Sequence, residues 1–172
     1  MSGNDRSGAA ATKEFVLART FDATRETVWR AFTESERLRQ WWGPKDFTML
    51  ACNVDLRPGG LFHYGMQAPT GQTMWGKCVY REIVIPERIV FVVSFSDENA
   101  GITRHPLSES WPLELLSSMT FEERDGRTLI TDRAVPINAT EEERRTFEEN
   151  LEGMKQGTDG SWDQLAAYLA KA

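Results

Sequence analysis

The sequence predicts an α+β fold, in which a long C-terminal helix crosses the concave face of a curved antiparallel sheet of six to seven strands. Between Asp46 and Arg133, β-prone runs alternate with turn signals that contain Gly, Pro or Asp, a pattern typical of antiparallel strands joined by short turns. From Thr140 to Ala170, apolar residues recur three or four positions apart, which indicates an amphipathic helix. Because the helical patterns are clustered and do not alternate with the strands, the class is α+β.

The segment before the sheet region predicts one strand and two short helices. Residues 14–21 (EFVLARTF) suit a first strand, since β-branched and aromatic residues favour extended backbone. Asp22 or Thr24 supplies an oxygen that can cap the helical run ETVWRAF. A second helical run, ERLRQWW, ends at Gly43 and Pro44, which are typical helix-stop residues.

The remaining strands follow one another with short connections. We expect them at residues 47–56, 61–67, 74–84, 89–95, 112–123 and 127–135. Side chains alternate between the two faces of a strand, so one set in each strand should face the long helix. These sets are Phe62, Tyr64 and Met66; Ile89, Phe91, Val93 and Phe95; and Leu115, Ser117, Met119 and Phe121.

Two further features concern irregular regions. The last helical pattern contains Gly153, Gly157 and Gly160, and because interior glycines weaken a helix, we expect a break near 157–160. Residues 97–112 form a longer link than a hairpin needs, and long ordered loops are often lids. This segment is therefore a candidate flap over one end of the space between the sheet and the long helix.

Composition narrows the functional classes. With 172 residues and 40% hydrophobic content, the chain suits one domain over residues 13–172, and the small polar residues 1–12 predict a disordered tail. A net charge of −6 without a basic stripe excludes a nucleic-acid-binding class. No apolar run is long enough to insert into a membrane and no signal peptide begins the chain, so we expect a cytoplasmic protein.

Several motifs, in their order, resemble one family. They are the runs FVLARTFDATRETVWRAFTESERLRQWWGP, RPGGLFHYGM, GKCVYREIVIPERIVF, MTFEERDGRTLIT and LEGMKQGTDGSWDQLAAYL. Together they cover about residues 14–170 and resemble the START-like helix-grip superfamily (SRPBCC), specifically single-domain bacterial proteins related to the C-terminal domain of the activator of Hsp90 ATPase. The resemblance implies a helix-grip fold with a cavity between the sheet and the last helix. Relatives with this architecture bind lipids, hormones or polyketides, and a few catalyse cyclisation or dehydration.

The sequence contains few patterns that are typical of catalytic or metal-binding sites. His63 and His105 are the two histidines and lie on separate elements, while Cys52 and Cys78 have no clustered ligands, so we expect no metal site. Nucleophile turns and nucleotide-binding glycine loops are missing from the sequence, so we expect no cofactor and no nucleophilic catalysis. Acid–base chemistry stays open, because one titratable group in an apolar cavity can have a shifted pKa. The candidates are Tyr64, Lys77, Tyr80, Arg81, Glu114 and Asp132.

Aromatic and sulfur-containing side chains give the candidate ligand site. Six Trp and six Met exceed what one small core readily uses, and Met and Trp suit adaptable apolar binding walls. The predicted lining residues are Phe62, Tyr64, Met66, Trp75, Phe91, Phe95, Met119, Met154 and Trp162. Trp41 and Trp42 are adjacent, so we expect one under the Pro44 turn and the other at the cavity rim.

The sequence therefore favours a module that binds a small apolar or amphipathic molecule and has no chemistry of its own. Two alternatives remain: a cyclase- or dehydratase-like enzyme that uses a cavity Tyr or carboxylate, and an Hsp90 co-chaperone-like interaction module. The Hsp90 activators of the family carry a second, N-terminal domain, which the short segment before the first strand does not match. A homodimer is a further expectation, with Val90, Trp111 and Leu116 on an outer face.

Overall fold

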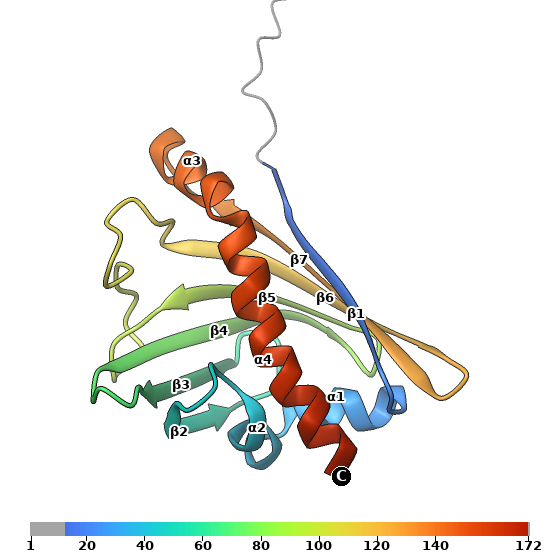
Figure 1. Cartoon of the computed structure of the whole chain (residues 1–172). Helices are drawn as coiled ribbons and strands as arrows, with labels where there is room; N and C mark the ends of the chain where they lie inside the picture. The colour runs from blue at the N-terminus through green and yellow to red at the C-terminus, as the bar shows by residue number, and fades with distance from the viewer. Residues whose placement is uncertain (1–12, 172) are drawn as a thin grey trace, which may run out of the picture.

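The computed structural model describes residues 13–171, so the tail expected at 1–12 lies outside the described residues. A seven-stranded antiparallel sheet carries the long helix α4 diagonally across one face, with α1 and α2 beside it at one end (Figure 1). The order of strands in the sheet is β1-β7-β6-β5-β4-β3-β2. The elements are β1 (Phe15–Phe21), α1 (Arg25–Thr33), α2 (Ser35–Trp41), β2 (Thr48–Val54), β3 (Leu61–Gln67), β4 (Thr73–Val84), β5 (Arg88–Phe95), β6 (Glu114–Arg124), β7 (Arg127–Ile137), α3 (Glu141–Glu149) and α4 (Leu151–Lys171). The predicted α+β class, with its curved sheet and long C-terminal helix, is confirmed.

Local sequence explains how the first helices begin and end. The Thr24 side chain accepts a hydrogen bond from the Thr27 backbone N–H and caps α1. After α2, Gly43 has a φ of +96°, a conformation that glycine adopts without strain. The chain therefore turns sharply there and enters β2.

Pairing between the first and last strands closes one edge of the concave face. Leu17 of β1 lies opposite Asp132 of β7, and Asp132 lies opposite Met119 of β6. Directly opposed residues point to the same face of a sheet. Asp132 therefore points to the same concave side as Met119, toward α4.

The C-terminal helical region differs from the expectation. It consists of two helices separated at Asn150, which has φ −107° and ψ 10°, and α4 is continuous through Gly157 and Gly160. The break expected near 157–160 is therefore wrong. Each glycine costs roughly 0.5–1 kcal/mol, which is less than the burial of Trp162 and Leu165 on the same helix contributes.

The link between β5 and β6 packs against α3. The Arg104 guanidinium lies 2.7 Å from Glu143, and the rings of Trp111 and Phe147 are 5.9 Å apart between centroids. Glu143 also completes a capping box with Thr140 at the start of α3. These contacts fix the link to the sheet end beside α3 (Figure 1).

Within residues 13–171, no helix combines the length and the apolar character that crossing a membrane requires.

Candidate ligand-binding cavity

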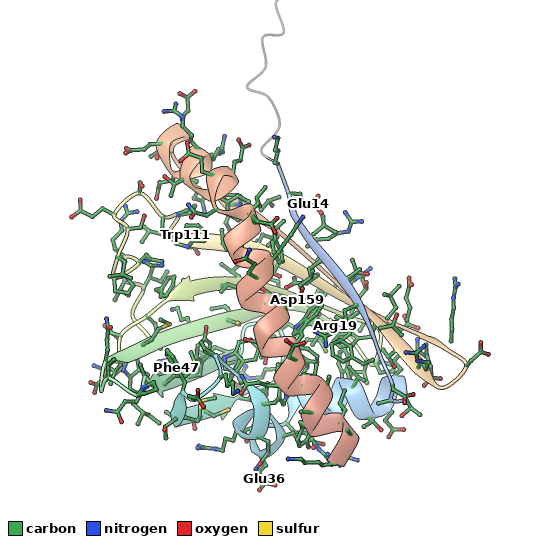
Figure 2. The ribbon with its side chains drawn as sticks, in the orientation of Figure 1. Glu14, Arg19, Glu36, Phe47, Trp111 and Asp159 are labelled. Carbon is green, nitrogen blue, oxygen red and sulfur yellow. The ribbon has the colours of Figure 1, made fainter. Side chains whose placement is uncertain are left out.

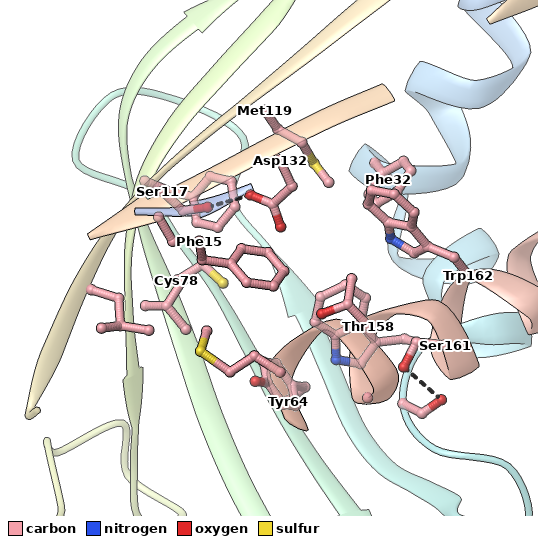
Figure 3. Close-up of a pocket in the computed structure, with 18 of the residues that line it drawn as sticks. Phe15, Phe32, Tyr64, Cys78, Ser117, Met119, Asp132, Thr158, Ser161 and Trp162 are labelled. Carbon is pink, nitrogen blue, oxygen red and sulfur yellow. Dashed lines mark hydrogen bonds between the residues drawn. The ribbon is translucent and has the colours of Figure 1, made fainter. Parts of the chain in front are cut away.

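A cavity of about 300 Å³ lies between the concave face of the sheet and α4. Figure 3 shows its walls, with Asp132, Ser117 and Met119 on the sheet and Thr158 and Trp162 on α4. This volume is near the lower end of the roughly 300–1,000 Å³ typical of small-molecule sites. The lining residues are Phe15, Phe32, Trp41, Trp42, Gly43, Pro44, Tyr64, Met66, Cys78, Phe91, Val93, Leu115, Ser117, Met119, Asp132, Ala134, Met154, Gly157, Thr158, Ser161 and Trp162.

Packing at one end holds α4 over the sheet. Trp162 is 2% exposed and meets the edge of Phe21 with 5.7 Å between ring centroids, while Leu165 is fully buried. The Gly43 carbonyl accepts hydrogen bonds from Ser161 and Gln164, which tie the turn after α2 to the helix. Because this end is tightly packed, the space lies under the preceding turns of α4.

Both tryptophans of the Trp41-Trp42 pair line the cavity, which corrects the expectation that only one would reach it. Trp41 is 2% exposed and donates a hydrogen bond of 3.0 Å from Nε1 to the Ala31 carbonyl. Trp42 packs edge-on against Tyr64 at 5.4 Å between centroids. The planes of the two indole rings meet at 69°, with 5.4 Å between centroids.

The polar feature of the cavity is the Asp132 carboxyl group. Its Oδ1 accepts a hydrogen bond of 2.7 Å from the Ser117 hydroxyl, and Figure 3 shows its other oxygen directed into the cavity. Burial raises the pKa of Asp132 to about 6, although the Ser117 hydrogen bond acts in the opposite direction. The carboxyl group therefore titrates close to neutrality.

The other titratable side chains of the wall stay neutral near pH 7. Burial raises the pKa of the Cys78 thiol to about 12 and raises the pKa of Tyr64 above its usual range. The Tyr64 ring lies over Gly76 on the neighbouring strand, since a Cβ there would lie 2.4 Å from the Tyr64 hydroxyl. No Lys, Arg or His belongs to the wall as described. Asp132 is thus the one charged group that these lining residues contribute.

Six of the nine predicted lining residues lie on the cavity wall. They are Tyr64, Met66, Phe91, Met119, Met154 and Trp162.

The other three predicted residues lie elsewhere. Trp75 pairs with Gly65 on the opposite face of the sheet and stacks on His63 at 5.3 Å between ring centroids. Phe62 lines an adjoining space of about 40 Å³. Phe95 borders a separate hollow of about 120 Å³ and packs against His105 at 4.7 Å.

Several wall residues were not anticipated. Phe15 and Ala134 reach the cavity because β1 pairs with β7, a long-range contact that strand alternation does not specify. Phe32 lies at the end of α1 and lines the cavity. Helical spacing predicts which face of α1 is apolar, but not what that face packs against. Ser117 belongs to the set predicted to face the helix, so its placement could have been found from the alternation.

None of the remaining candidates for chemistry lines the cavity: Tyr80 borders the adjoining space of about 40 Å³, and Glu114 begins β6. Lys77 donates a hydrogen bond of 2.7 Å to the Ala100 carbonyl, and Arg81 is exposed. Residues 97–112 contribute nothing to the wall of the main cavity. Among residues 13–171, no group of three or more His, Cys, Asp or Glu side chains is arranged to hold a metal ion.

Comparisons with known proteins agree with the fold described above. The family model described as activator of Hsp90 ATPase homolog 1-like protein matches residues 22–170. A solved structure from Nitrosomonas europaea is 26% identical, with a TM-score of 0.72 over 94% of this chain and 96% of that chain. One from Mycobacterium smegmatis is 25% identical, with a TM-score of 0.73 over 92% and 91% of the two chains. A structure from Arthrobacter aurescens, 24% identical with a TM-score of 0.74 over 94% and 88%, supports the fold. No curated protein matches the chain.

Proposed function

This chain belongs to the family of activator of Hsp90 ATPase homolog 1-like proteins, and we propose that it binds a small apolar or amphipathic molecule between the sheet and α4. The fold is one that commonly binds ligands. The proposal depends on one observation: the cavity of about 300 Å³ is walled mainly by aromatic, aliphatic and sulfur-containing side chains.

The chemistry of the wall favours a guest with an apolar body. Phe91, Met119 and Met154 present flexible or flat apolar surfaces from strands and helix, and such surfaces gain free energy when they cover apolar ligand atoms. Asp132 and Ser117 add one polar position on the sheet. A few convergent polar groups in an apolar pocket are typical of small-molecule sites.

The test is a titration with neutral alcohols of increasing apolar size, read through tryptophan emission. Trp41, Trp42 and Trp162 line the cavity, so a bound guest should shift or quench their emission. We expect saturable binding that strengthens with chain length until the cavity is filled and then weakens. Emission that stays unchanged across the series, together with no bound molecule in native mass spectrometry, would refute the proposal.

One observation favours a second candidate, an acid–base enzyme of the cyclase or dehydratase kind. The Asp132 carboxyl group points into an apolar cavity and has its pKa raised to about 6 by burial, which is near the optimum for a general base or acid at neutral pH. Exchange of the α-protons of a bound ketone with deuterated water would support this candidate if Asp132→Asn abolishes the exchange.

The interaction-module alternative receives less support. It requires an exposed apolar patch on the outer face of the sheet. Of the large apolar side chains that are exposed among the described residues, Leu50 lies in β2, and Ile85, Ile102, Leu107 and Leu113 lie in connections. Val90, Trp111 and Leu116, where a homodimer contact was expected, are only partly exposed.

The two cysteines support a cytoplasmic setting for the proposed function. Cys52 and Cys78 are both buried and free. Unpaired buried thiols are typical of proteins in reducing compartments.

A further inference from the structure

We infer that the cavity selects amphipathic amines, with the cationic nitrogen bound at Asp132 and the apolar body against the aromatic wall. This inference rests on the proposed function and names the ligand class of the same site.

The first argument is that the Asp132 carboxyl group has no cationic partner among the lining residues. The described wall contains one carboxyl group and no cationic side chain. The hydrogen-bond partner of Asp132 among the described residues is the Ser117 hydroxyl at 2.7 Å, which bonds to one of the two oxygens. The other oxygen is directed into the cavity (Figure 3). An acceptor oxygen in an apolar space is incompletely satisfied until a donor arrives.

The second argument is the electrostatic balance. Burying an ion pair is unfavourable when both partners must leave water for it. Here Asp132 is only partly exposed in the folded protein, so its carboxyl group has lost part of its hydration before the amine binds. Because the pKa of Asp132 is about 6, most molecules carry the carboxylate at pH 7.5. An ammonium then forms a charge-assisted hydrogen bond, which is about twice as strong as a neutral one.

The surroundings of Asp132 agree with a ligand that supplies the positive charge. The titratable groups facing the cavity from other strands are Tyr64 of β3 and Cys78 of β4, and both are neutral near pH 7 because burial raises their pKa values. From α4, the cavity is faced by uncharged side chains such as Thr158 and Trp162. A carboxylic acid guest would instead place two negative charges in one apolar space, which is unfavourable.

The apolar body of the guest would lie against the apolar side chains of the same wall. Met119 lies directly opposite Asp132, and Phe15 and Phe91 also line the cavity. Aromatic rings in such a wall accept a flat guest in edge-on or offset geometry. An aryl-alkyl amine is thus the simplest guest that satisfies both the carboxylate and the wall.

The experiment compares three probes that share one skeleton: 4-phenylbutylamine, 4-phenylbutan-1-ol and 4-phenylbutyrate. Isothermal titration calorimetry at pH 7.5 should show the amine binding roughly 10- to 100-fold more tightly than the alcohol, and the carboxylate binding least. Asp132→Asn should lower the affinity for the amine to that for the alcohol. Asp163→Asn is the matched control, since Asp163 is an exposed α4 residue paired with Arg19, and it should keep the preference for the amine.

A second measurement uses the unmodified protein and therefore does not depend on the folding of a variant. Between pH 7.5 and pH 5, affinity for the amine should fall as Asp132 becomes protonated, while affinity for the alcohol should stay constant. Equal affinities of amine and alcohol, or a preference for the carboxylate, would overturn the inference and leave the proposed function standing. Binding of none of the three probes, nor of any alcohol in the size series, would overturn both.

Discussion

The Ser117 hydroxyl lies 2.7 Å from Oδ1 of Asp132 and joins β6 to β7 on the concave face of the sheet. Met119, two residues from Ser117 on β6, lies directly opposite Asp132, so the hydroxyl approaches the carboxyl group diagonally. Figure 2 labels Arg19 on β1, the strand that pairs with β7, and Asp159 on α4, which form an ion pair. The bond holds one carboxylate oxygen and leaves the other directed into the cavity.

Ser117→Ala should raise the pKa of Asp132 above its value of about 6 in the unmodified protein. The Ser117 hydrogen bond favours the ionised carboxyl group, and its loss leaves burial unopposed. The pKa can be measured by NMR titration of the Asp132 side-chain carbon. Ser117→Thr keeps a hydroxyl group and should leave the pKa nearly unchanged. A pKa that does not respond to Ser117→Ala would show that the bond is not formed in solution.

Asp132→Asn should change how stability depends on pH. In the folded protein the pKa of Asp132 is raised to about 6 from an ordinary value of 3.8, so between these two pH values the folded state binds more protons than the unfolded state. The free energy of unfolding therefore falls as pH rises from about 4 to about 6, by about 2–3 kcal/mol from this group. Asn cannot titrate, so the variant should lack this part of the slope and be the more stable protein at pH 7.

Urea denaturation from pH 4 to pH 8 checks this prediction. Groups such as Glu143, whose pKa is lowered mainly by the Thr140 backbone N–H, contribute equally to both proteins. The difference between the two curves therefore isolates Asp132. Parallel curves at all pH values would mean that the carboxyl group is solvated in the folded state.

Met154→Trp should block ligand binding without unfolding the protein. Met154 lines the cavity from α4, and an indole ring there would occupy space that the guest needs. We expect affinity for 4-phenylbutan-1-ol to fall at least about tenfold, equivalent to about 1.4 kcal/mol. Lys155→Trp introduces the same side chain at the adjacent exposed position and should leave affinity unchanged. Equal affinities of the two variants would place the guest outside this cavity.

Gly43→Ala and Gly160→Ala should have opposite effects on stability. At Gly43, φ is +96° and a Cβ would lie 2.3 Å from the Met66 sulfur, so alanine should lower the free energy of unfolding by at least about 1 kcal/mol. At Gly160, a Cβ meets no atom within 4 Å, so alanine should raise it by about 0.5–1 kcal/mol through helix propensity. Thermal denaturation of both variants checks this pair, and stabilisation by Gly43→Ala would contradict the described turn.

The sequence by itself determined the seven strands, the first two helices and the relative faces of the strands, but not the division of the C-terminal helical region at Asn150. The strand at 61–67 has the predicted bounds, and the other strands differ by a few residues at their ends. Alternation placed Tyr64 with Met66 and separated both from His63, because successive side chains of a strand must point to opposite faces. Such local patterns need no knowledge of the rest of the chain.

Only the tertiary structure decided which residues meet. Trp75 lies on the outer face because its strand pairs with β3 in the register Gly65 to Trp75, and a register one residue away would have turned it inward. Asp132 acquired its raised pKa because α4 and the neighbouring strands enclose it together. Register and burial depend on contacts between residues far apart in the chain. No local sequence pattern specifies the free energies of those contacts.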